Sequence, residues 1–484
     1  SLLAAKLVAK LRSQGWSLGV REVFESPTVA GQAQRMRVLG SETALVPVVR
    51  EEDAPLSYAQ QRLWFLSQME GESASYNMPT AVRLRGALSV EALERALVAV
   101  VSRHEVLRSV YVYRDGEPRQ RVLGVEAFGL EVEDWSARAR AGLDQALSEA
   151  ASAHARRAFR LSEELPIRAR LIVLGGEEHV LLLCLHHIAF DGWSVGVLGR
   201  ELSQAYAQAL EGAVSLPALP VQYIDYAVWQ RAWLAEGREA AQLGYWRERL
   251  SGLAPLLELP TDRARPAVQS HRGATLPVSV GAELTARLRG LASSQGASLF
   301  MVLLAGLQGV LSRYSGQTDI AVGTPVANRP HDALSGLVGF FVNTLVVRTE
   351  VASERGFGEL VSAVKAATLG AYEHADVPFE RVVEALQPER SLSHSPLFQV
   401  MFDLQHAQGA GDAVALPSLR SEVLGEGTES AKFDLLLSLR EQGEGLEGGL
   451  QYATDLFDAS TVERLWSHCV ALLEAGVSSP SRAL

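Results

Sequence analysis

The residues best suited to do chemistry lie together at positions 186–194, which read HHIAFDGWS. A histidine titrates near neutral pH and can act as a general base or bind a metal. A serine within a G-x-S-x-G pattern can act as a nucleophile. Three kinds of chemistry therefore compete for this segment, beside an interpretation in which both histidines are ordinary half-buried residues.

A metal site is one interpretation. Two histidines and an aspartate suit zinc by residue type. However, His186 and His187 are neighbours on a predicted strand, where successive side chains point to opposite faces. One ion would not readily reach both rings, so we expect no metal here.

A serine hydrolase is the second interpretation. Residues 192–196 read GWSVG, which fits G-x-S-x-G with Ser194 as the nucleophile, and His331, His374 or His394 would complete a triad. In that motif the serine follows its strand directly. Here a polar stretch lies between the strand and Ser194, so we keep this interpretation only as an alternative.

Acyl transfer run by one histidine, without a covalent enzyme intermediate, is the third interpretation. Strand geometry implies that one histidine faces a cavity while the other packs inside. Asp191 follows His187 by four residues. It is placed to hold the turn or a basic partner rather than to act on a substrate.

The elements that must position this segment alternate between helix and strand, which predicts an α/β body. The run 180–185 is continuously apolar and predicts a strand buried on both faces, followed by a helix over 194–210. A polar, tryptophan-rich stretch at 219–250 is a candidate join between two lobes. The other predicted elements are a helix capped by Ser89, a strand at 108–113 turned at Asp115-Gly116, a hairpin arm at 171–174, helices at 283–314 and 355–371, and strands at 319–323, 341–348 and 397–404.

Composition excludes several classes of protein. The chain has 484 residues, 48% of them hydrophobic and 21% charged, which is ordinary for a globular protein. A net charge of −11 argues against binding to nucleic acid or to an anionic membrane. Two cysteines cannot form a disulfide framework, and no apolar run approaches a membrane span. We expect a cytoplasmic protein.

The first 54 residues differ from the rest. Residues 1–12 predict a helix that Gly15 ends. A short segment follows at 20–24, and a last short helix is expected over 29–37. So few apolar residues do not fold alone, so this part is a fragment or docks on the body. Residues 38–54 lack a period and end in charge, which is typical of a linker.

The segment HHIAFDG matches the HHxxxDG motif of the condensation domains of non-ribosomal peptide synthetases, which are relatives of chloramphenicol acetyltransferase. Six further stretches resemble that family's other motifs in the same order. They are SYAQQRLWFL at 57–66, RHEVLR at 103–108, YIDYAVW at 223–229, VGFFVNT at 338–344, HADVPFE at 374–380 and, more loosely, RSLSHSPL at 390–397. The chain is thus identified as a member of this family over about 55–480.

The resemblance implies two acetyltransferase-like lobes that form a V-shaped pseudo-dimer, with the active site in a tunnel between them. A donor carrier presents an upstream thioester, and the α-amine of an acceptor aminoacyl thioester attacks it. His187 would carry the chemistry, and the Gly192 amide would face the oxyanion. His186 and Asp191 would be structural, with Asp191 paired to Arg329.

Further residues are carried over as candidates for the tunnel wall. They are Arg62, Trp193, Ser194 and Asn343. An aromatic pair such as Trp64 and Phe65 is more often core packing. A buried amide such as Asn343 is more often a hydrogen-bonding group.

The amino-terminal residues resemble the second half of a peptidyl carrier protein, through SLLAA at 1–5 and FESPTVA at 24–30. This implies a 4'-phosphopantetheine arm on Ser1, or otherwise an arm brought by partner carriers. Ser1 as a simple helix N-cap stays open. The resemblance divides the chain into a partial carrier (1–40), a linker (41–54), and lobes at 55–225 and 226–484.

The implied partners are donor and acceptor peptidyl carrier proteins and an adjacent adenylation domain, as in the synthesis of antibiotics or siderophores. The sequences DGWS at 191–194 and FFVNT at 340–344 look most like the subtype that joins an L-configured donor to an L-configured acceptor. A rival from another class is a non-catalytic condensation-like module that recruits partner proteins. Such modules tend to lose the motif histidine, which this chain keeps.

Overall fold

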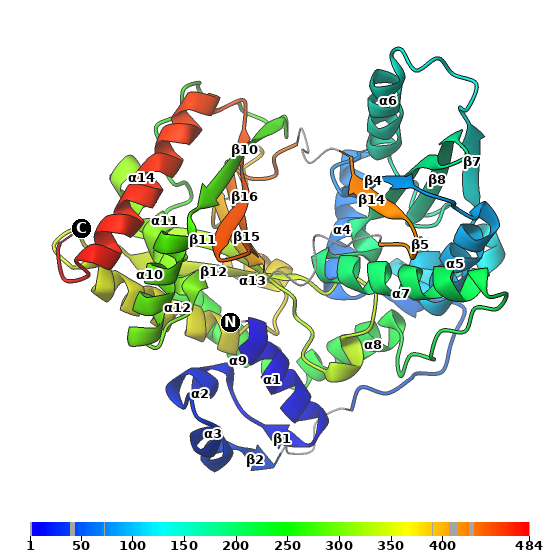
Figure 1. The fold of residues 1–484 in the computed structure, drawn as a ribbon. Helices are drawn as coiled ribbons and strands as arrows, with labels where there is room; N and C mark the ends of the chain where they lie inside the picture. Colours follow the sequence, from blue (N-terminus) through cyan, green and yellow to red (C-terminus); the bar gives the residue numbers. More distant parts are fainter. Residues whose placement is uncertain are drawn as a thin grey trace.

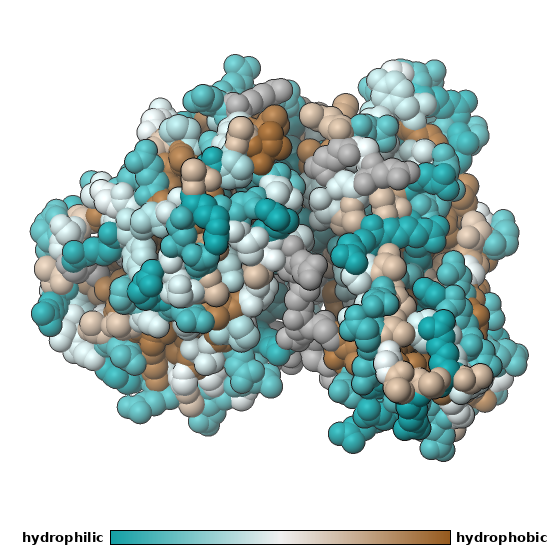
Figure 2. Space-filling model, turned by 90° about the horizontal axis from the view of Figure 1, so that it is seen from above, coloured by the Kyte–Doolittle hydropathy of each residue, from teal (hydrophilic) through white to brown (hydrophobic). Residues whose placement is uncertain are grey.

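The computed structural model describes residues 2–38, 44–71, 73–389, 391–405, 415–424 and 430–483. Two α/β lobes diverge from a shared base and give the molecule the predicted V shape (Figure 1). Viewed from above, the lobes are separate masses with a hollow between them (Figure 2). The expected two-lobed fold is confirmed.

The amino-terminal lobe is built on a five-stranded sheet of order β14-β4-β9-β8-β7. Its central strand, β9, is antiparallel to both β4 and β8, and eight of its nine residues are buried. This confirms the strand predicted from the apolar run, and Cys184 is one of its small buried side chains. The strands of this lobe are β3 (Ala54–Pro55), β4 (Asn77–Arg85), β5 (Ser109–Arg114), β6 (Glu117–Val122), β7 (Leu130–Asp134), β8 (Ile167–Gly175) and β9 (Glu178–His186), with β14 (Arg420–Val423) added.

Helices cover this sheet and join the lobes. As predicted, Ser89 caps a helix and Asp115-Gly116 turns a hairpin, both turn residues having positive φ. The long helices are α4 (Tyr58–Glu70), α5 (Val90–Arg103), α6 (Leu143–Arg156), α7 (Gly192–Leu210), α8 (Tyr223–Ala235) and α9 (Arg238–Leu250). Short 3-10 helices are η1 (Glu105–Arg108), η2 (Val125–Ala127) and η3 (His187–Ala189). The predicted lobe boundary at 225/226 falls inside α8, whose aromatic residues pack in the amino-terminal core.

The carboxy-terminal lobe has a six-stranded sheet of order β10-β16-β15-β13-β11-β12. The helix predicted over 283–314 is two helices, because Ser298 caps the second and the pair bends by 105°. The strands are β10 (Gly273–Val280), β11 (Asp319–Val326), β12 (Asn343–Glu350), β13 (Val400–Gln405), β15 (Leu435–Gln442) and β16 (Gly445–Ala453). The helices are α10 (Ala282–Ser294), α11 (Leu299–Ser315), η4 (Asp332–Leu334), α12 (Phe357–Glu373), α13 (Phe379–Leu386) and α14 (Ala459–Ser478).

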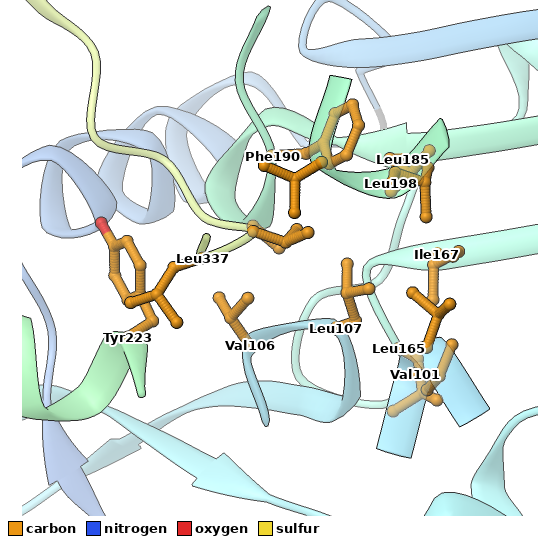
Figure 3. Close-up of a cluster of buried hydrophobic side chains, with 14 of the residues drawn as sticks. Val101, Val106, Leu107, Leu165, Ile167, Leu185, Phe190, Leu198, Tyr223 and Leu337 are labelled. Atoms are coloured by element: carbon orange, nitrogen blue, oxygen red, sulfur yellow. The ribbon is translucent and has the colours of Figure 1, made fainter. Parts of the chain in front are cut away.

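Two segments of the carboxy-terminal lobe enter the amino-terminal lobe. Strand β14 pairs antiparallel with β4 and forms the edge of that sheet. Residues 327–342, which follow β11, insert Leu337 among buried side chains such as Val106 and Phe190 (Figure 3). We call residues 327–342 the inserted loop, and the two lobes share a core through it.

The amino-terminal segment docks on this body. Helices α1 (Leu2–Ser13) and α3 (Val29–Arg35) lie where helices are expected, and α2 (Val20–Glu25) is a further helix that the sequence did not predict. Strand β1 (Trp16–Ser17) pairs with β2 (Arg37–Val38). Val20 and Phe24 pack against the carboxy-terminal core, and Arg21 Nε lies 2.8 Å from Glu373 Oε1. Ser1, the predicted attachment site, lies outside the described residues.

The described part of the predicted linker is held in place. The Asp225 carboxylate accepts hydrogen bonds from the Val48 amide at 2.8 Å and from Arg50 at 2.5 and 3.1 Å. Leu45 is buried, and Ala54-Pro55 joins the small sheet with β6. The linker therefore lies against the lobe along a defined path.

No single helix among the described residues is long and apolar enough to cross a membrane, although α10 and α11 pass that test as a bent pair. Most residues of α11 are buried in the carboxy-terminal core. Cys184 and Cys469 are both free and buried.

Candidate active site

His187 stands where the central strand of the amino-terminal lobe ends. Strand β9 stops at His186, and His187 opens the 3-10 turn η3. Its backbone N–H donates to the Tyr76 carbonyl at 2.9 Å, and its Nδ1 lies 3.0 Å from the Phe190 carbonyl oxygen. Because a carbonyl only accepts, Nδ1 carries the proton and Nε2 keeps a lone pair. Nε2 hydrogen-bonds to none of the described residues.

The surroundings hold the His187 ring in its neutral form. Burial lowers the pKa of His187 to about 3, and the nearby charge of Lys432 lowers it further, whereas the Phe190 carbonyl opposes the shift. The Phe340 ring lies 5.5 Å away, centroid to centroid. At neutral pH this half-buried imidazole can accept a hydrogen bond or a proton through Nε2.

His186 is turned to the interior. Its Nδ1 accepts the Ile188 backbone N–H at 3.1 Å, and its ring lies 5.8 Å from that of Phe159. Burial lowers the pKa of His186 to about 3 as well. The two histidines therefore differ in environment as expected, although His187 lies in η3 rather than on the strand.

Asp191 ties the two lobes together beneath the histidine turn. It is the N-cap of α7, accepting the Ser194 backbone N–H at 2.9 Å, and it also accepts the Phe341 N–H of the inserted loop at 3.1 Å. Arg329 Nη2 lies 3.2 Å from Asp191 Oδ1, and both side chains are at least 96% buried. The ion pair expected from sequence is present.

Arg329 also organises the inserted loop. Its Nη1 donates to the carbonyls of Leu334 at 2.6 Å and Leu337 at 2.8 Å, and its guanidinium lies 3.9 Å from the Phe341 ring centroid. Burial lowers the pKa of Arg329, and Asp191 opposes that effect. Removing either partner would leave a buried charge uncompensated.

Gly192 is exposed at the first position of α7. An amide at this position has no acceptor within the helix. A Cβ added at Gly192 would meet no atom within 4 Å, so the space before it is open. Its N–H, which directly follows the histidine turn in the chain, donates to none of the residues that the structure describes.

Ser194 does not line a tunnel, which corrects that prediction. The side chain is fully buried, and its Oγ donates to Asp191 Oδ1 at 2.7 Å and accepts the Gly339 N–H at 3.0 Å. Its remaining partners are the Gly339 carbonyl and Arg329. A buried hydroxyl without a histidine partner is not an activated nucleophile, so the geometry disfavours the hydrolase interpretation.

Asn343 is also buried rather than lining a tunnel. Its Nδ2 donates to the carbonyls of Ala375 at 2.8 Å and Val377 at 2.9 Å, while its Oδ1 accepts the amides of Thr344 and Phe379. The side chain fixes the turn before α13. The alternative interpretation, a buried hydrogen-bonding amide, is the right one.

Trp193 and Arg62 make contacts that join parts of the molecule. Trp193 Nε1 donates to the Ser335 carbonyl at 2.9 Å, and Lys6 Nζ of α1 lies 4.6 Å from its ring centroid. Arg62 Nη1 of α4 lies 2.8 Å from Glu380 Oε1 of α13. Trp193 thus contacts both the inserted loop, through Ser335, and the docked amino-terminal segment, through Lys6. The Arg62–Glu380 pair bridges the two lobes.

The two aromatic residues Trp64 and Phe65 differ in burial. Trp64 is buried and its ring stacks on Tyr113 at 5.6 Å, as expected of core packing. Phe65 is 48% exposed, which the core interpretation did not predict. Because the two are neighbours on α4, they cannot share one helix face.

A polar groove of about 560 Å³ lies elsewhere, in the carboxy-terminal lobe, where Tyr245 and Arg249 of α9 meet Arg348 of β12. Arg348 is engaged by Asp319, at 2.7 Å, and by backbone carbonyls. The groove contains no histidine. Among the residues that the structure describes, no cluster of His, Cys, Asp or Glu is arranged to hold a metal ion.

Sequence analysis missed Tyr76 and Lys432. Tyr76 holds the His187 backbone, and Lys432 Nζ lies 4.4 Å from the Tyr76 ring centroid. The available signal for Lys432 was its residue type, because the chain has only four lysines among 45 basic residues. No comparable signal marks Tyr76, whose carbonyl contacts His187 and whose ring contacts Lys432.

Comparison with known proteins gives a consistent family. The condensation domain model matches residues 50–484. One of the linear gramicidin synthase proteins of Brevibacillus parabrevis is 45% identical over 490 residues, which cover 99% of this chain and 6% of that protein. The chain spans 6–10% of the length of the first curated relatives.

Solved structures of other proteins also resemble this chain. The X-domain from teicoplanin biosynthesis has a TM-score of 0.83 and 34% identity, covering 91% of this chain and 98% of that one. A complex of the X-domain and OxyB gives a TM-score of 0.81 and 33% identity over 92% of this chain and 97% of that one.

Proposed function

Because the chain belongs to the condensation-domain family of nonribosomal peptide synthetases, whose members form amide bonds, we propose that it joins two carrier-bound thioesters into a peptide. The amine nitrogen of the acceptor attacks the carbonyl carbon of the donor thioester. The carbon–sulfur bond breaks, the amine loses a proton, and the donor arm leaves as a thiol. The chain grows by one residue on the acceptor.

One observation carries this proposal: Nε2 of His187 is held unprotonated and hydrogen-bonds to none of the described residues. Gly192, five residues further along the chain, opens α7 with open space where a Cβ would stand. In our proposal Nε2 accepts a hydrogen bond from the attacking amine and orients its lone pair. The Gly192 N–H faces the oxyanion of the tetrahedral intermediate. His186 and the Asp191–Arg329 pair hold the turn that presents both groups.

The reaction needs only a moderate rate acceleration from His187. A free α-amine has a pKa of about 7.7–8.0, so at pH 7 its neutral form is disfavoured by only about 1 kcal/mol. Positioning two tethered reactants supplies up to about 7–11 kcal/mol. We therefore propose that His187 acts chiefly as a hydrogen-bond acceptor that orients the attacking amine.

The substrates would arrive on 4'-phosphopantetheine arms of donor and acceptor carriers, loaded by an adenylation domain. The docked segment 2–38 would be the latter part of the donor carrier, with Ser1 as its attachment site. Both substrates would be L-configured. Intact-protein mass of the apo chain incubated with a phosphopantetheinyl transferase and coenzyme A tests the Ser1 assignment. A Ser1→Ala variant is its control.

The central experiment loads separate donor and acceptor carriers with aminoacyl thioesters and follows the acceptor by intact-protein mass. The proposal expects a dipeptidyl acceptor with the wild-type chain and a strong loss with His187→Ala. Wild-type turnover by His187→Ala would refute the role of the histidine. Free hydrolysed acid with labelling of Ser194 by a fluorophosphonate would instead support a hydrolase.

A second candidate function has one observation in its favour. The X-domain, which is similar to this chain, has been solved in a complex with OxyB. A recruiting role for this chain predicts stable binding to another protein and no dipeptide in the carrier assay. The retained His187 and its open Nε2 favour the catalytic proposal over this one.

A further inference from the structure

Lys432 belongs to the carboxy-terminal lobe, and its ammonium group contacts the amino-terminal lobe. Its backbone is fixed just before β15, because the Ala431 N–H donates to the His271 carbonyl at 2.8 Å and Ala431 is buried. Its half-buried side chain places Nζ 4.4 Å from the ring centroid of Tyr76, which immediately precedes β4. The contact therefore crosses from one lobe to the other.

Tyr76 connects this cation to the histidine pair. The Tyr76 carbonyl accepts the His187 backbone N–H at 2.9 Å, and the Tyr76 ring lies 6.3 Å from the His186 ring. A cation over an aromatic face is attracted by the negative face of the ring. One residue thus holds both the backbone of His187 and the ammonium group of Lys432.

The residue type at 432 is unusual for this chain. Four of the 45 basic residues are lysines, and all the others are arginines. Lysine presents a compact point charge on a flexible stem, whereas arginine presents a broad planar fork that favours paired carboxylates. At position 432 the compact charge of a lysine lies over the ring of Tyr76.

Among the described residues, the charged groups that shift the pKa of His187 share one sign. Lys432 lowers the pKa of His187 more than any other charged group, and His186 adds a smaller effect in the same direction. Lys432 is likewise the leading charge acting on His186, with Arg168 second. The Phe190 carbonyl and the Phe340 ring, which also face His187, carry no net charge.

We infer that Lys432 is a positioning residue of the active site, which sets the electrostatic state of the His187 imidazole and of the amine that approaches it. This inference rests on the proposed function for its effect on the amine. A like charge disfavours protonation of both nitrogen bases. Lys432 thereby keeps His187 a hydrogen-bond acceptor and the incoming amine a nucleophile.

The direct test is the titration of His187 by NMR in the full chain with ring-labelled histidine, in which the His187→Ala variant identifies the signal. Lys432→Met keeps the stem over Tyr76 and removes the charge. It should raise the pKa of His187 by about one. Lys432→Arg keeps the charge and should leave the pKa unchanged, as should Lys10→Met at an exposed lysine of α1. An unchanged pKa of His187 in Lys432→Met would overturn the inference. If Lys432→Met does not fold, Lys432→Gln takes its place in the same titration.

The second test is the pH profile of dipeptide formation between loaded carriers. Relative to wild type, Lys432→Met should lose several-fold more activity at pH 6 than at pH 8, and Lys432→Arg should follow wild type. A uniform loss at both pH values would mark a purely structural lysine and refute the inference. If the wild-type chain forms no dipeptide, the proposed function fails while the titration still decides the role of Lys432.

Discussion

The two lobes contain the same structural unit, and only one of them has a candidate active site. In the amino-terminal lobe, β9 is a nine-residue hairpin arm that leads through residues 187–191 into α7. In the carboxy-terminal lobe, β16 is also a nine-residue hairpin arm and leads through residues 454–458 into α14. The two turns have the same length and both end in Phe-Asp.

The difference lies in what covers each turn. Asp191 is buried against Arg329 of the inserted loop, whereas Asp458 pairs with Arg263 at the surface, both side chains being about half exposed. His187 in the first turn corresponds by position to Thr454 in the second. The backbone unit is therefore not enough for a site, which also needs the histidine and a cover from the other lobe.

The largest expected effect is on stability. Asp191→Ala should destabilise the fold by about 3–5 kcal/mol, because it leaves Arg329 buried without its partner. Asp458→Ala breaks an exposed pair and should cost less than about 1 kcal/mol. Denaturant unfolding of both variants checks the contrast, and equal losses would contradict it.

The next effect is on catalysis. His187→Ala should slow dipeptide formation about 10²-fold, because the attacking amine loses the acceptor that orients it, with little change in melting temperature. Thr454→Ala removes the positional counterpart and should leave the rate unchanged. Equal rates for His187→Ala and Thr454→Ala in the carrier assay would show that the two turns do not differ in function.

A smaller effect concerns pH. His187 has a pKa of about 3 in the folded chain, against an ordinary value of 6.5. Between these values the unfolded chain binds the proton and the folded chain does not, so stability falls as pH drops from 6.5 towards 3. Each such histidine contributes up to about 1.4 kcal/mol per pH unit.

The substitution His187→Thr, which copies the second turn, tests this. The free energy of unfolding should depend less steeply on pH below 6 in this variant than in wild type. Chemical denaturation at pH 6.5, 5.5 and 4.5 measures the slope. An identical slope in both proteins would show that His187 is not buried as a neutral ring.

The smallest expected effect is at the bridge between α4 and α13. Arg62 and Glu380 are partly exposed, so a double-mutant cycle of Arg62→Ala and Glu380→Gln should give a coupling below about 1 kcal/mol. A coupling as large as the loss in Asp191→Ala would mean that this pair, rather than the buried one, holds the lobes together.

Local patterns predicted the elements whose signals are local. The apolar run gave the central strand, and Ser89 and Asp115-Gly116 marked a helix start and a turn correctly. Strand parity predicted that the two histidines face different environments, and the family motif led to the Asp191–Arg329 pair. These features depend on neighbours within a few residues or on a known motif.

Features that depend on distant pairing escaped prediction. The sequence of β14 does not indicate that this strand completes the sheet of the amino-terminal lobe. The residues near Ser194 do not indicate that the inserted loop buries the Ser194 side chain. The contact of Lys432 with Tyr76 likewise joins segments that are far apart in sequence. Tertiary contacts of this kind override local preference.

The crossing of β14 and the inserted loop limits how this molecule can be divided. A cut between the lobes would leave β4 as an unpaired edge and open a void where Leu337 packs. We therefore expect neither lobe to fold when expressed alone. An exchange of this domain should therefore carry both lobes together, because a junction between residues 226 and 419 would separate β14 from the sheet that it completes.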